Sequence, residues 1–336
     1  MRPLLLFLCC LACTAASLAG GTGALDQTIA RLRSQTPVAT SEKQEIEAAV
    51  SAALSADPAD PRAKYARALL DRSNGNAKTA KEAVEALAKA YPERAEYHAT
   101  LGTLCFESIN DAGTFEKMSL ASKGRAEYEK AIELDPNLVE PYVGLGRFYR
   151  MAPGYAGGSY KKAEEQARLL IAIPEGKGEL FGRSLLADIY ADKGQWELVQ
   201  EQYQLAEKAP GATTGYAFRA YATALLNKKK DPAAALVVLE KYQAVASPDD
   251  ASPWYLTAEA KRALGKLDDA IAMYNKVLTI NAAAVNSRYS LAETLEKVGR
   301  FGDAATQYKE FASRFPSDPR AAKATEAAAR CQGKAK

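Results

Sequence analysis

The segment GKLDDAIAMY at residues 265–274 decides the fold, because it returns further along the chain as GRFGDAATQY at residues 299–308. Glycine, an apolar residue, alanine and tyrosine keep the same places in both copies. Similarity of a chain to itself at a fixed period is the signature of a repeat array, and the two copies define a 34-residue period. We therefore take this pair as the reference and look for further copies outward from it.

Earlier segments fill the same slots. Trp254 stands at the start of the unit that contains GKLDDAIAMY. Other units place leucine, glycine or alanine, and tyrosine at one spacing, and some close with proline: Leu101 and Gly102; Leu145, Gly146 and Tyr149; Leu186, Ala187 and Tyr190; Pro92, Pro136 and Pro316. This order resembles the tetratricopeptide repeat, a pair of antiparallel helices with the pattern W-x2-L-G-x2-Y, A-x3-F, P. The resemblance implies an all-α, right-handed solenoid of about seven helix-turn-helix repeats.

The register predicts where each repeat begins and ends. We expect repeats at residues 61–94, 95–138, 139–179, 180–215, 216–250, 251–284 and 285–318, with capping helices at 42–56 and 319–331. Small residues at the glycine and alanine slots let the paired helices approach closely. Each pair leaves an apolar face that only a neighbouring pair or a cap can cover. Asp231 before Pro232 agrees with this register, because an N-cap acid followed by proline is a helix start.

The second and third repeats are longer than the others. Their extra residues, 107–123 and 151–162, are expected between the two helices of each repeat, projecting side by side from one rim of the array. The first insert carries Phe115 and Met118, and the second has the order Ala-Pro-Gly-x-x-Gly-Gly. This combination resembles a family of exported bacterial repeat proteins, which implies a bacterial origin and no particular activity.

Residues 1–19 have the composition of a signal peptide. Arg2 is followed by the apolar run at residues 3–11 and by small residues that end at Ala19, where we expect cleavage. Residues 20–41 are expected to form a flexible segment before the first cap. The expected location is therefore the bacterial periplasm.

Two kinds of membrane attachment are alternatives to a free periplasmic chain: a lipid anchor and a membrane-spanning helix. A lipid anchor at Cys13 is the less favoured alternative, because bacterial lipoprotein signals normally carry leucine three residues before the lipidated cysteine, and Cys10 stands there. No later segment approaches the roughly 20 apolar residues that a membrane-spanning helix needs. We expect no membrane span.

The composition argues against several classes of function. The 44 basic and 41 acidic residues nearly cancel, so no strong global field favours nucleic acid. His98 is the sole histidine, and Cys105 and Cys331 are the cysteines that remain after cleavage. No motif for a metal, a cofactor or an activated nucleophile is present, and we expect no metal, no cofactor and no enzymatic activity.

A binding surface is predicted on the first helix of each repeat. These helices line the concave face of such an array, and positions spaced by three, four and three residues share one side of a helix. Tyrosine and arginine, which are common at interaction hot spots, recur there. The predicted partner-binding residues are Arg62, Tyr65, Arg72, Arg147, Arg150, Asp188, Tyr255, Glu259, Arg262, Tyr289, Glu293 and Glu296. The alternative is that they form ordinary solvated helix faces.

The groove is also predicted to become acidic toward its C-terminal end. Glu296 stands in the last repeat at the slot that Arg262 fills in the preceding one. We therefore predict a non-enzymatic protein-protein interaction scaffold of the bacterial cell envelope, which binds a peptide or a partner protein. The alternative is a small-ligand binding accessory protein of a periplasmic transport system, with a pocket roofed by the inserts 107–123 and 151–162.

Overall fold

A computed structural model describes residues 16–33, 40–109, 112–210 and 215–335. Most of the expected signal peptide, with Cys13, lies outside the described residues. Within them the backbone forms helices and turns and no strand, which confirms the all-α fold class. No helix of this part of the chain is both long and apolar enough to cross a membrane.

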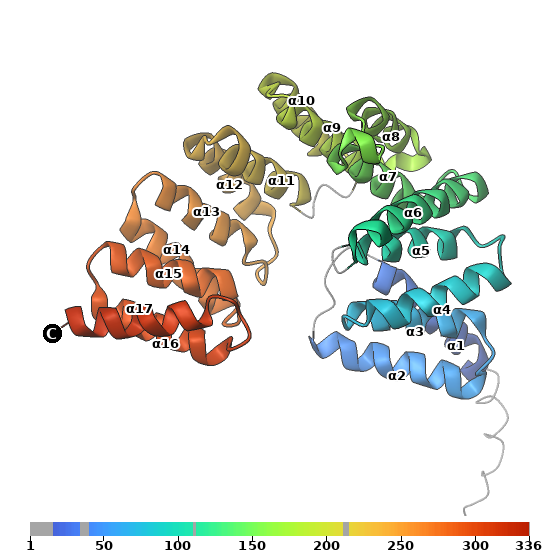
Figure 1. Cartoon of the computed structure of the whole chain (residues 1–336), viewed down its shortest axis with the longest axis horizontal. Helices are drawn as coiled ribbons and strands as arrows, with labels where there is room; N and C mark the ends of the chain where they lie inside the picture. Colours follow the sequence, from blue (N-terminus) through green and yellow to red (C-terminus); the bar gives the residue numbers. More distant parts are fainter. Residues whose placement is uncertain (1–15, 34–39, 110–111, 211–214, 336) are drawn as a thin grey trace, which may run out of the picture. The chain divides into compact units, whose positions relative to one another are not determined.

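The chain divides into an N-terminal unit, Met1–Gly158, and a C-terminal unit, Ser159–Lys336 (Figure 1). The N-terminal unit contains α1 (Ala16–Arg33), α2 (Thr40–Ala56), α3 (Pro61–Ser73), α4 (Ala77–Ala90), α5 (Ala95–Glu107), α6 (Thr114–Leu134) and α7 (Val139–Met151). The C-terminal unit contains α8 (Tyr160–Ala172), α9 (Glu179–Asp192), α10 (Trp196–Ala206), α11 (Tyr216–Ala224), α12 (Pro232–Val245), α13 (Ser252–Ala263), α14 (Leu267–Ile280), α15 (Val285–Lys297), α16 (Phe301–Arg314) and α17 (Ala321–Lys334). The division falls within the second insert, between α7 and α8.

Consecutive helices pack in pairs, and within each unit neighbouring pairs pack on one another. The pairs are α3 with α4 and α5 with α6 in the N-terminal unit, and α9 with α10, α11 with α12, α13 with α14, and α15 with α16 in the C-terminal unit. Helix α17 packs against α16 and covers the last pair. The chain is therefore a series of helix hairpins, as the 34-residue period predicts.

The repeated segment 265–274 shows why its residue types recur. Gly265 closes the turn between α13 and α14 with φ of 75°, and Gly299 does the same between α15 and α16 with φ of 80°. This left-handed conformation strains any residue that has a Cβ atom, so glycine is favoured there. Ala270 and Tyr274 follow on α14 and are fully buried. The glycine reverses the chain, and the alanine and tyrosine fill the contact between the helices.

Helix α1 differs from the expectation that residues 20–41 form a flexible segment. It continues to Arg33, and Leu25 and Leu32 are 5% and 7% exposed within the core of the N-terminal unit. The helix forms because Leu25, Ile29 and Leu32 recur at the spacing of one helix face, so burying them offsets the cost of ordering the segment. Helix α1 lies outside the 34-residue register, so the repeat pattern does not predict it.

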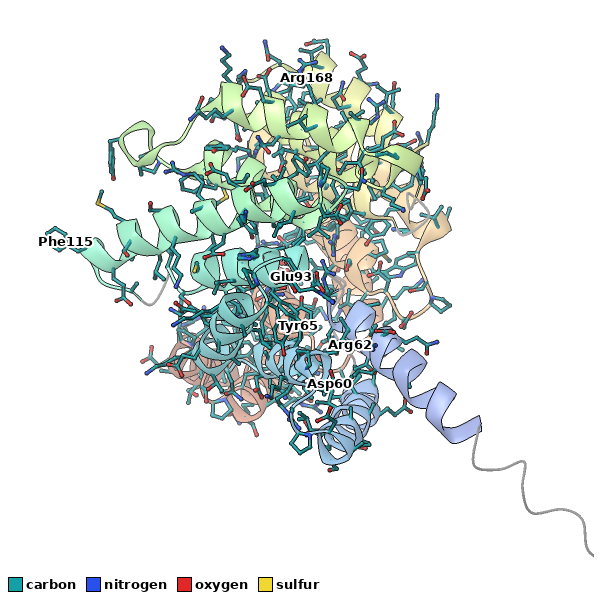
Figure 2. All side chains as sticks on the ribbon, turned by 90° about the vertical axis from the view of Figure 1, so that its right-hand side faces the viewer. Asp60, Arg62, Tyr65, Glu93, Phe115 and Arg168 are labelled. Atoms are coloured by element: carbon teal, nitrogen blue, oxygen red, sulfur yellow. The ribbon has the colours of Figure 1, made fainter. Side chains whose placement is uncertain are left out.

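The first insert is mostly helix and not a loop between helices. Helix α6 has 21 residues, whereas the corresponding helix α4 has 14. The extra residues of 107–123 therefore lengthen the second helix of the repeat at its N-terminal end. Figure 2 shows the labelled Phe115 at the end of this extension, and its side chain is 90% exposed.

The second insert forms a tight loop. It contains a 3-10 turn, Gly154–Ala156, followed by Gly157 with φ of 95°. A Cβ atom on Gly157 would lie 3.4 Å from Nη1 of Arg125, which belongs to α6. The loop therefore runs beside the helix that carries the first insert.

Tyr128 of α6 fixes the contact among three helices. Its side chain is 4% exposed, and its hydroxyl lies 2.9 Å from Oγ1 of Thr103 on α5. A Cβ atom at Gly102 of α5 would stand 2.7 Å from the Tyr128 ring, and one at Gly144 of α7 would stand even closer. Two glycines thus make room for one tyrosine where α5, α6 and α7 meet.

Candidate functional site

The predicted binding residues lie on the first helices of the pairs and are described for each unit separately. In the N-terminal unit we call Arg62, Tyr65, Arg72, Glu140 and Arg147, on α3 and α7, the N-terminal first-helix surface. In the C-terminal unit we call Tyr255, Glu259, Arg262, Tyr289, Glu293 and Glu296, on α13 and α15, the C-terminal first-helix surface. Asp188 lies on α9 and is half-buried.

Tyr65 belongs to the core more than to a free surface. Its side chain is 1% exposed, and its ring centroid lies 4.8 Å from that of Tyr97. The hydroxyl shares a hydrogen bond of 2.7 Å with Oγ1 of Thr100 on the next first helix. Burial raises the pKa of this phenol well above its ordinary value. The Tyr65 ring therefore joins two helix pairs and presents almost no surface to a partner.

The arginines of the N-terminal first-helix surface differ in their surroundings. Nε and Nη2 of Arg72 donate to the Glu107 carboxylate at 3.0 and 2.6 Å, which links α3 to the end of α5. Arg147 is exposed on α7 and makes no hydrogen bond or ion pair with the residues that the structure describes. Arg150, at the end of the same helix, is half-buried.

Helix α1 lies on this surface. Arg62 forms an ion pair with Asp26 of α1, and Figure 2 shows Arg62 beside that helix. Arg33, at the other end of the contact, pairs with Glu140 of α7 at 3.4 Å. Part of the predicted N-terminal binding surface is therefore covered by the chain itself.

The C-terminal unit contains a pocket of 450 Å³ between α13, α15, α16 and α17. Figure 1 shows α15, α16 and α17 together at one end of this unit. The pocket is lined by Arg262, Tyr289, Glu293, Thr294, Glu296, Lys297, Tyr308, Lys323, Ala327 and Arg330. None of these residues belongs to the inserts 107–123 and 151–162, so this pocket is not the one that the ligand-carrier alternative placed under them.

The pocket is not acidic, which corrects the predicted charge of the groove. Its lining has four basic side chains, on Arg262, Lys297, Lys323 and Arg330, and two acidic ones, on Glu293 and Glu296. The prediction was wrong because it left out Lys297 of α15 as well as the side chains of α17. Helix α17 adds two cations to the wall, and the lining has a net positive charge.

An ion pair joins two walls of the pocket. Arg330 of α17 donates from Nε and Nη2 to the Glu296 carboxylate at 3.0 and 2.9 Å. The Tyr308 hydroxyl donates to the same carboxylate at 3.2 Å. Burial acts to raise the pKa of Glu296, but the hydrogen bonds and the charge of Arg330 outweigh it and hold that pKa below its ordinary value. Glu296 is therefore ionised near neutral pH.

Three charged groups of the lining remain open to a ligand. Lys297 and Lys323 are exposed and Glu293 is half-buried, and none makes a hydrogen bond or an ion pair with any residue in the described part of the chain. Arg262, by contrast, pairs with Glu259 at 2.6 Å. Glu259 also accepts a hydrogen bond from Tyr274. The two lysines and Glu293 are the groups that a ligand can reach without breaking an existing pair.

The residues of α17 were missed by sequence reasoning, although the 34-residue register contains them. Lys323 stands one full period after Tyr289, and Arg330 stands one full period after Glu296. Extending the register by one more unit places both side chains on the binding stripe. Helix α17, predicted as a simple cap, thus stands where the first helix of a further repeat would stand.

The remaining chemical groups have structural roles. His98 is 9% exposed, with Nδ1 2.6 Å from Glu127 and Nε2 3.0 Å from the carbonyl oxygen of Pro92. Cys105 and Cys331 are free and buried, and burial raises the pKa of both thiols. Among the described residues, no cluster of three or more histidine, cysteine, aspartate or glutamate side chains has the arrangement to hold a metal ion.

Comparison with known proteins identifies the fold. No protein-family model and no curated protein matches the sequence. Yeast Tom70 aligns with a TM-score of 0.71 at 14% identity, over 99% of this chain and 67% of its own. A tetratricopeptide repeat protein from Parabacteroides merdae aligns with a TM-score of 0.53 at 13% identity, over 81% of this chain and 99% of its own. The chain has the tetratricopeptide-repeat (TPR) fold.

A third solved structure is similar to this chain over most of its length. A chain of the APC/C hetero-tetramer Cut9-Hcn1 aligns with a TM-score of 0.52 at 17% identity, over 95% of this chain and 57% of its own. At these identities the likenesses establish the fold alone. In this TPR chain the register-matched side chains of α13, α15 and α17 meet around one pocket, which makes the C-terminal first-helix surface the candidate functional site.

Proposed function

We propose that this TPR chain is a non-enzymatic protein-interaction scaffold of the bacterial cell envelope, and that it binds a peptide or partner protein at the C-terminal first-helix surface. The 450 Å³ pocket beside α17 is the observation that carries the proposal. Its volume is within the usual range for binding clefts, and its walls combine aromatic and charged side chains. Such a lining suits a peptide segment better than a purely apolar ligand.

The charges of the pocket indicate the chemistry of the partner. Lys297 and Lys323 are exposed cations without a carboxylate partner among the described residues. Glu293 provides an acceptor for a backbone N–H or for a basic side chain. A partner segment with carboxylates, and with at least one donor between them, satisfies all three groups. We therefore propose an acidic peptide segment as the bound element.

The test is a charge reversal on the pocket lining. Purified chain beginning at residue 20 is titrated with fluorescent peptides rich in aspartate and glutamate, and with matched lysine-rich peptides, at low and high salt. Lys297→Glu with Lys323→Glu should weaken binding of the acidic peptides by about tenfold, because each contact between exposed charges contributes up to about 1 kcal/mol. Salt should weaken wild-type binding in the same direction.

Lys208→Glu with Lys266→Glu is the matched control. Both lysines are exposed in the C-terminal unit and lie outside the pocket lining, so the net charge changes equally. Equal weakening by both pairs of substitutions would mean that the overall charge of the chain, and not the pocket, causes the effect. Unchanged binding by the pocket variant would remove the pocket from the binding surface.

The envelope location is tested independently of binding. The full gene product is expressed in a bacterial host, and the periplasmic and cytoplasmic fractions are compared by intact mass. The signal peptide predicts a periplasmic chain that begins at Gly20. A chain that keeps Met1 and remains in the cytoplasm would contradict the proposed location and leave the binding test intact.

A further inference from the structure

Helix α1 is an addition to the repeat array. The helix pairs and their caps follow the 34-residue register, whereas α1 precedes α2 and has no counterpart in that register. It packs on α3 and on α2, and Figure 1 shows it crossing behind α3. Its presence in the N-terminal unit therefore calls for a reason other than the repeat.

The face that α1 covers is the one predicted to bind a partner. Arg62 and Tyr65 of α3 belong to the predicted groove. Glu140 of α7 stands at the position of its repeat that corresponds to Arg62. Asp26 pairs with Arg62 at one end of the contact, and Arg33 pairs with Glu140 at the other. Helix α1 thus lies on α3 and reaches α7 through the Arg33–Glu140 ion pair, on the side where a bound segment is expected to lie.

The contact has the pattern of a helix bound in a groove. Leu25, Ile29 and Leu32 follow one another at intervals of four and three residues, and all three pack into the core cluster of the N-terminal unit. Amphipathic helices that bind in grooves present anchors at such spacings. Gln27 and Ala30 lie on the exposed side of the helix, whereas Thr28 is buried and Arg31 pairs with Glu42 of α2. One face of α1 is buried and the other is free.

The ion pairs at the two ends of the contact give it a direction. Asp26, in the middle of α1, meets a cation, and Arg33, at its end, meets an anion. A helix in the reverse orientation would place like charges together at both ends. Glu140 is held in place by Thr103, whose Oγ1 donates to its carboxylate at 2.8 Å. The surface therefore favours one direction of a bound helix, with the acidic residue before the basic one, as well as an apolar stripe on that helix.

We propose that α1 is a built-in ligand of the N-terminal first-helix surface, and that this surface takes an amphipathic helix of a partner protein when α1 leaves. The partner helix has apolar anchors at i, i+4 and i+7, an acidic residue at i+1 and a basic residue at i+8. Because α1 is tethered close to its site, its effective concentration is on the order of millimolar. A partner in solution displaces α1 only if it binds more tightly or is held nearby. This surface shares no residue with the C-terminal pocket, so the two proposals can fail separately.

The experiment releases α1 without altering the surface beneath it. Full-length mature chain carrying Leu25→Asp and Leu32→Asp is titrated with a fluorescent peptide of residues 20–33. The control carries Gln27→Asp and Ala30→Asp, which place the same charges on the exposed face of α1. The peptide should bind the first variant at least tenfold more tightly than it binds the control or the wild type, because their own α1 occupies the site.

A charge exchange tests the direction of binding. In the Leu25→Asp, Leu32→Asp background, Arg62→Glu should weaken the peptide by several-fold, and a peptide with Asp26→Arg should restore it. Failure of the Leu25→Asp, Leu32→Asp chain to bind the peptide overturns the proposal. So does a loss of helical circular dichroism in the Leu25→Asp, Leu32→Asp chain beyond the signal of α1, since α1 would then be an integral part of the core. A wild-type dimer with Asp26–Arg62 cross-links between copies would instead assign the surface to a second copy.

Discussion

Gly144 of α7 faces the ring of Tyr128 on α6, and replacing this glycine with alanine tests the packing that joins the two helices. An alanine Cβ atom would lie well inside 3.0 Å of three atoms of the Tyr128 side chain. Tyr128 cannot easily turn away, because it is 4% exposed and its hydroxyl is held 2.9 Å from Oγ1 of Thr103. Either the tyrosine or the whole of α7 must shift.

Two effects of opposite sign determine the result for Gly144→Ala. Alanine in place of a glycine within a helix stabilises it by about 0.5–1 kcal/mol. Overpacking a filled contact costs about 1–3 kcal/mol. The overlap here involves an aromatic ring with no free space, so we expect the upper half of that range. The net prediction is that the free energy of unfolding of the N-terminal unit falls by about 1 kcal/mol or somewhat more.

Gly302 on α16 provides the matched control. It is exposed, and a Cβ atom there would meet no atom within 4 Å. Gly302→Ala should therefore stabilise the C-terminal unit by up to about 0.5–1 kcal/mol, since the helix propensity acts alone. The same substitution thus has opposite signs at the two sites.

The measurement is urea unfolding followed by circular dichroism, with hydrogen exchange to locate the change. Gly144→Ala should accelerate amide hydrogen exchange in α6 and α7, and Gly302→Ala should leave exchange in those two helices unchanged. In a Tyr128→Leu background the cost of Gly144→Ala should fall, which gives a coupling energy for the pair. Equal stabilisation by Gly144→Ala and Gly302→Ala would refute the packing argument.

Three other predictions concern individual side chains. Asp231→Ala should cost about 1 kcal/mol in the free energy of unfolding, because the carboxylate caps α12 by accepting a backbone N–H at 3.0 Å; an unchanged urea midpoint would contradict this role. Cys105 and Cys331 should react with iodoacetamide at pH 8 only after unfolding, since both thiols are buried with raised pKa values; mass spectrometry with and without urea measures this, and fast native labelling would refute it. The pKa of Glu296 is lowered in the folded chain, so its ion pair with Arg330 stabilises the fold at pH values above the ordinary glutamate pKa of 4.5. This stabilisation is lost as the pH falls through the lowered pKa of the folded chain. Glu296→Gln should therefore destabilise at pH 7, and urea titrations should show the difference shrinking at lower pH; a constant difference would count against the ion pair.

The residues that line the pocket show how far sequence reasoning reaches. Tyr289, Glu293 and Glu296 were placed correctly on one helix face, because helical spacing alone determines which side chains share a side. Lys323 and Arg330 belong to the same register one unit later and could have been predicted by continuing it. Their omission, together with that of Lys297, left the predicted groove acidic, whereas the pocket lining has a net positive charge. The error came from treating the last helix as a cover and not as a further wall.

Burial was less predictable than position. Tyr65 and Tyr289 stand at equivalent groove positions, and both are more than nine-tenths buried. Helical periodicity shows which side a residue faces, but not how closely the neighbouring pair approaches that side. The ring of Tyr289 packs against Phe311 at a centroid distance of 5.0 Å, and Tyr65 packs against Tyr97. The Tyr65–Tyr97 contact joins successive pairs, whereas the Tyr289–Phe311 contact lies within one pair, and both depend on how closely the helices approach, which the period does not encode.

By itself the sequence determined the helix pairs and their period, because each pair is a local unit whose turn glycine and small contact residues recur once in every repeat. The tertiary structure alone decided three things: that α1 lies on the N-terminal first-helix surface, that the first insert lengthens α6, and that α15, α16 and α17 enclose a pocket. All three depend on contacts between segments that the period does not relate or that lie beyond its last full unit. A repeat pattern relates each unit to the next, and the two proposed binding surfaces of this chain lie where that pattern begins and ends.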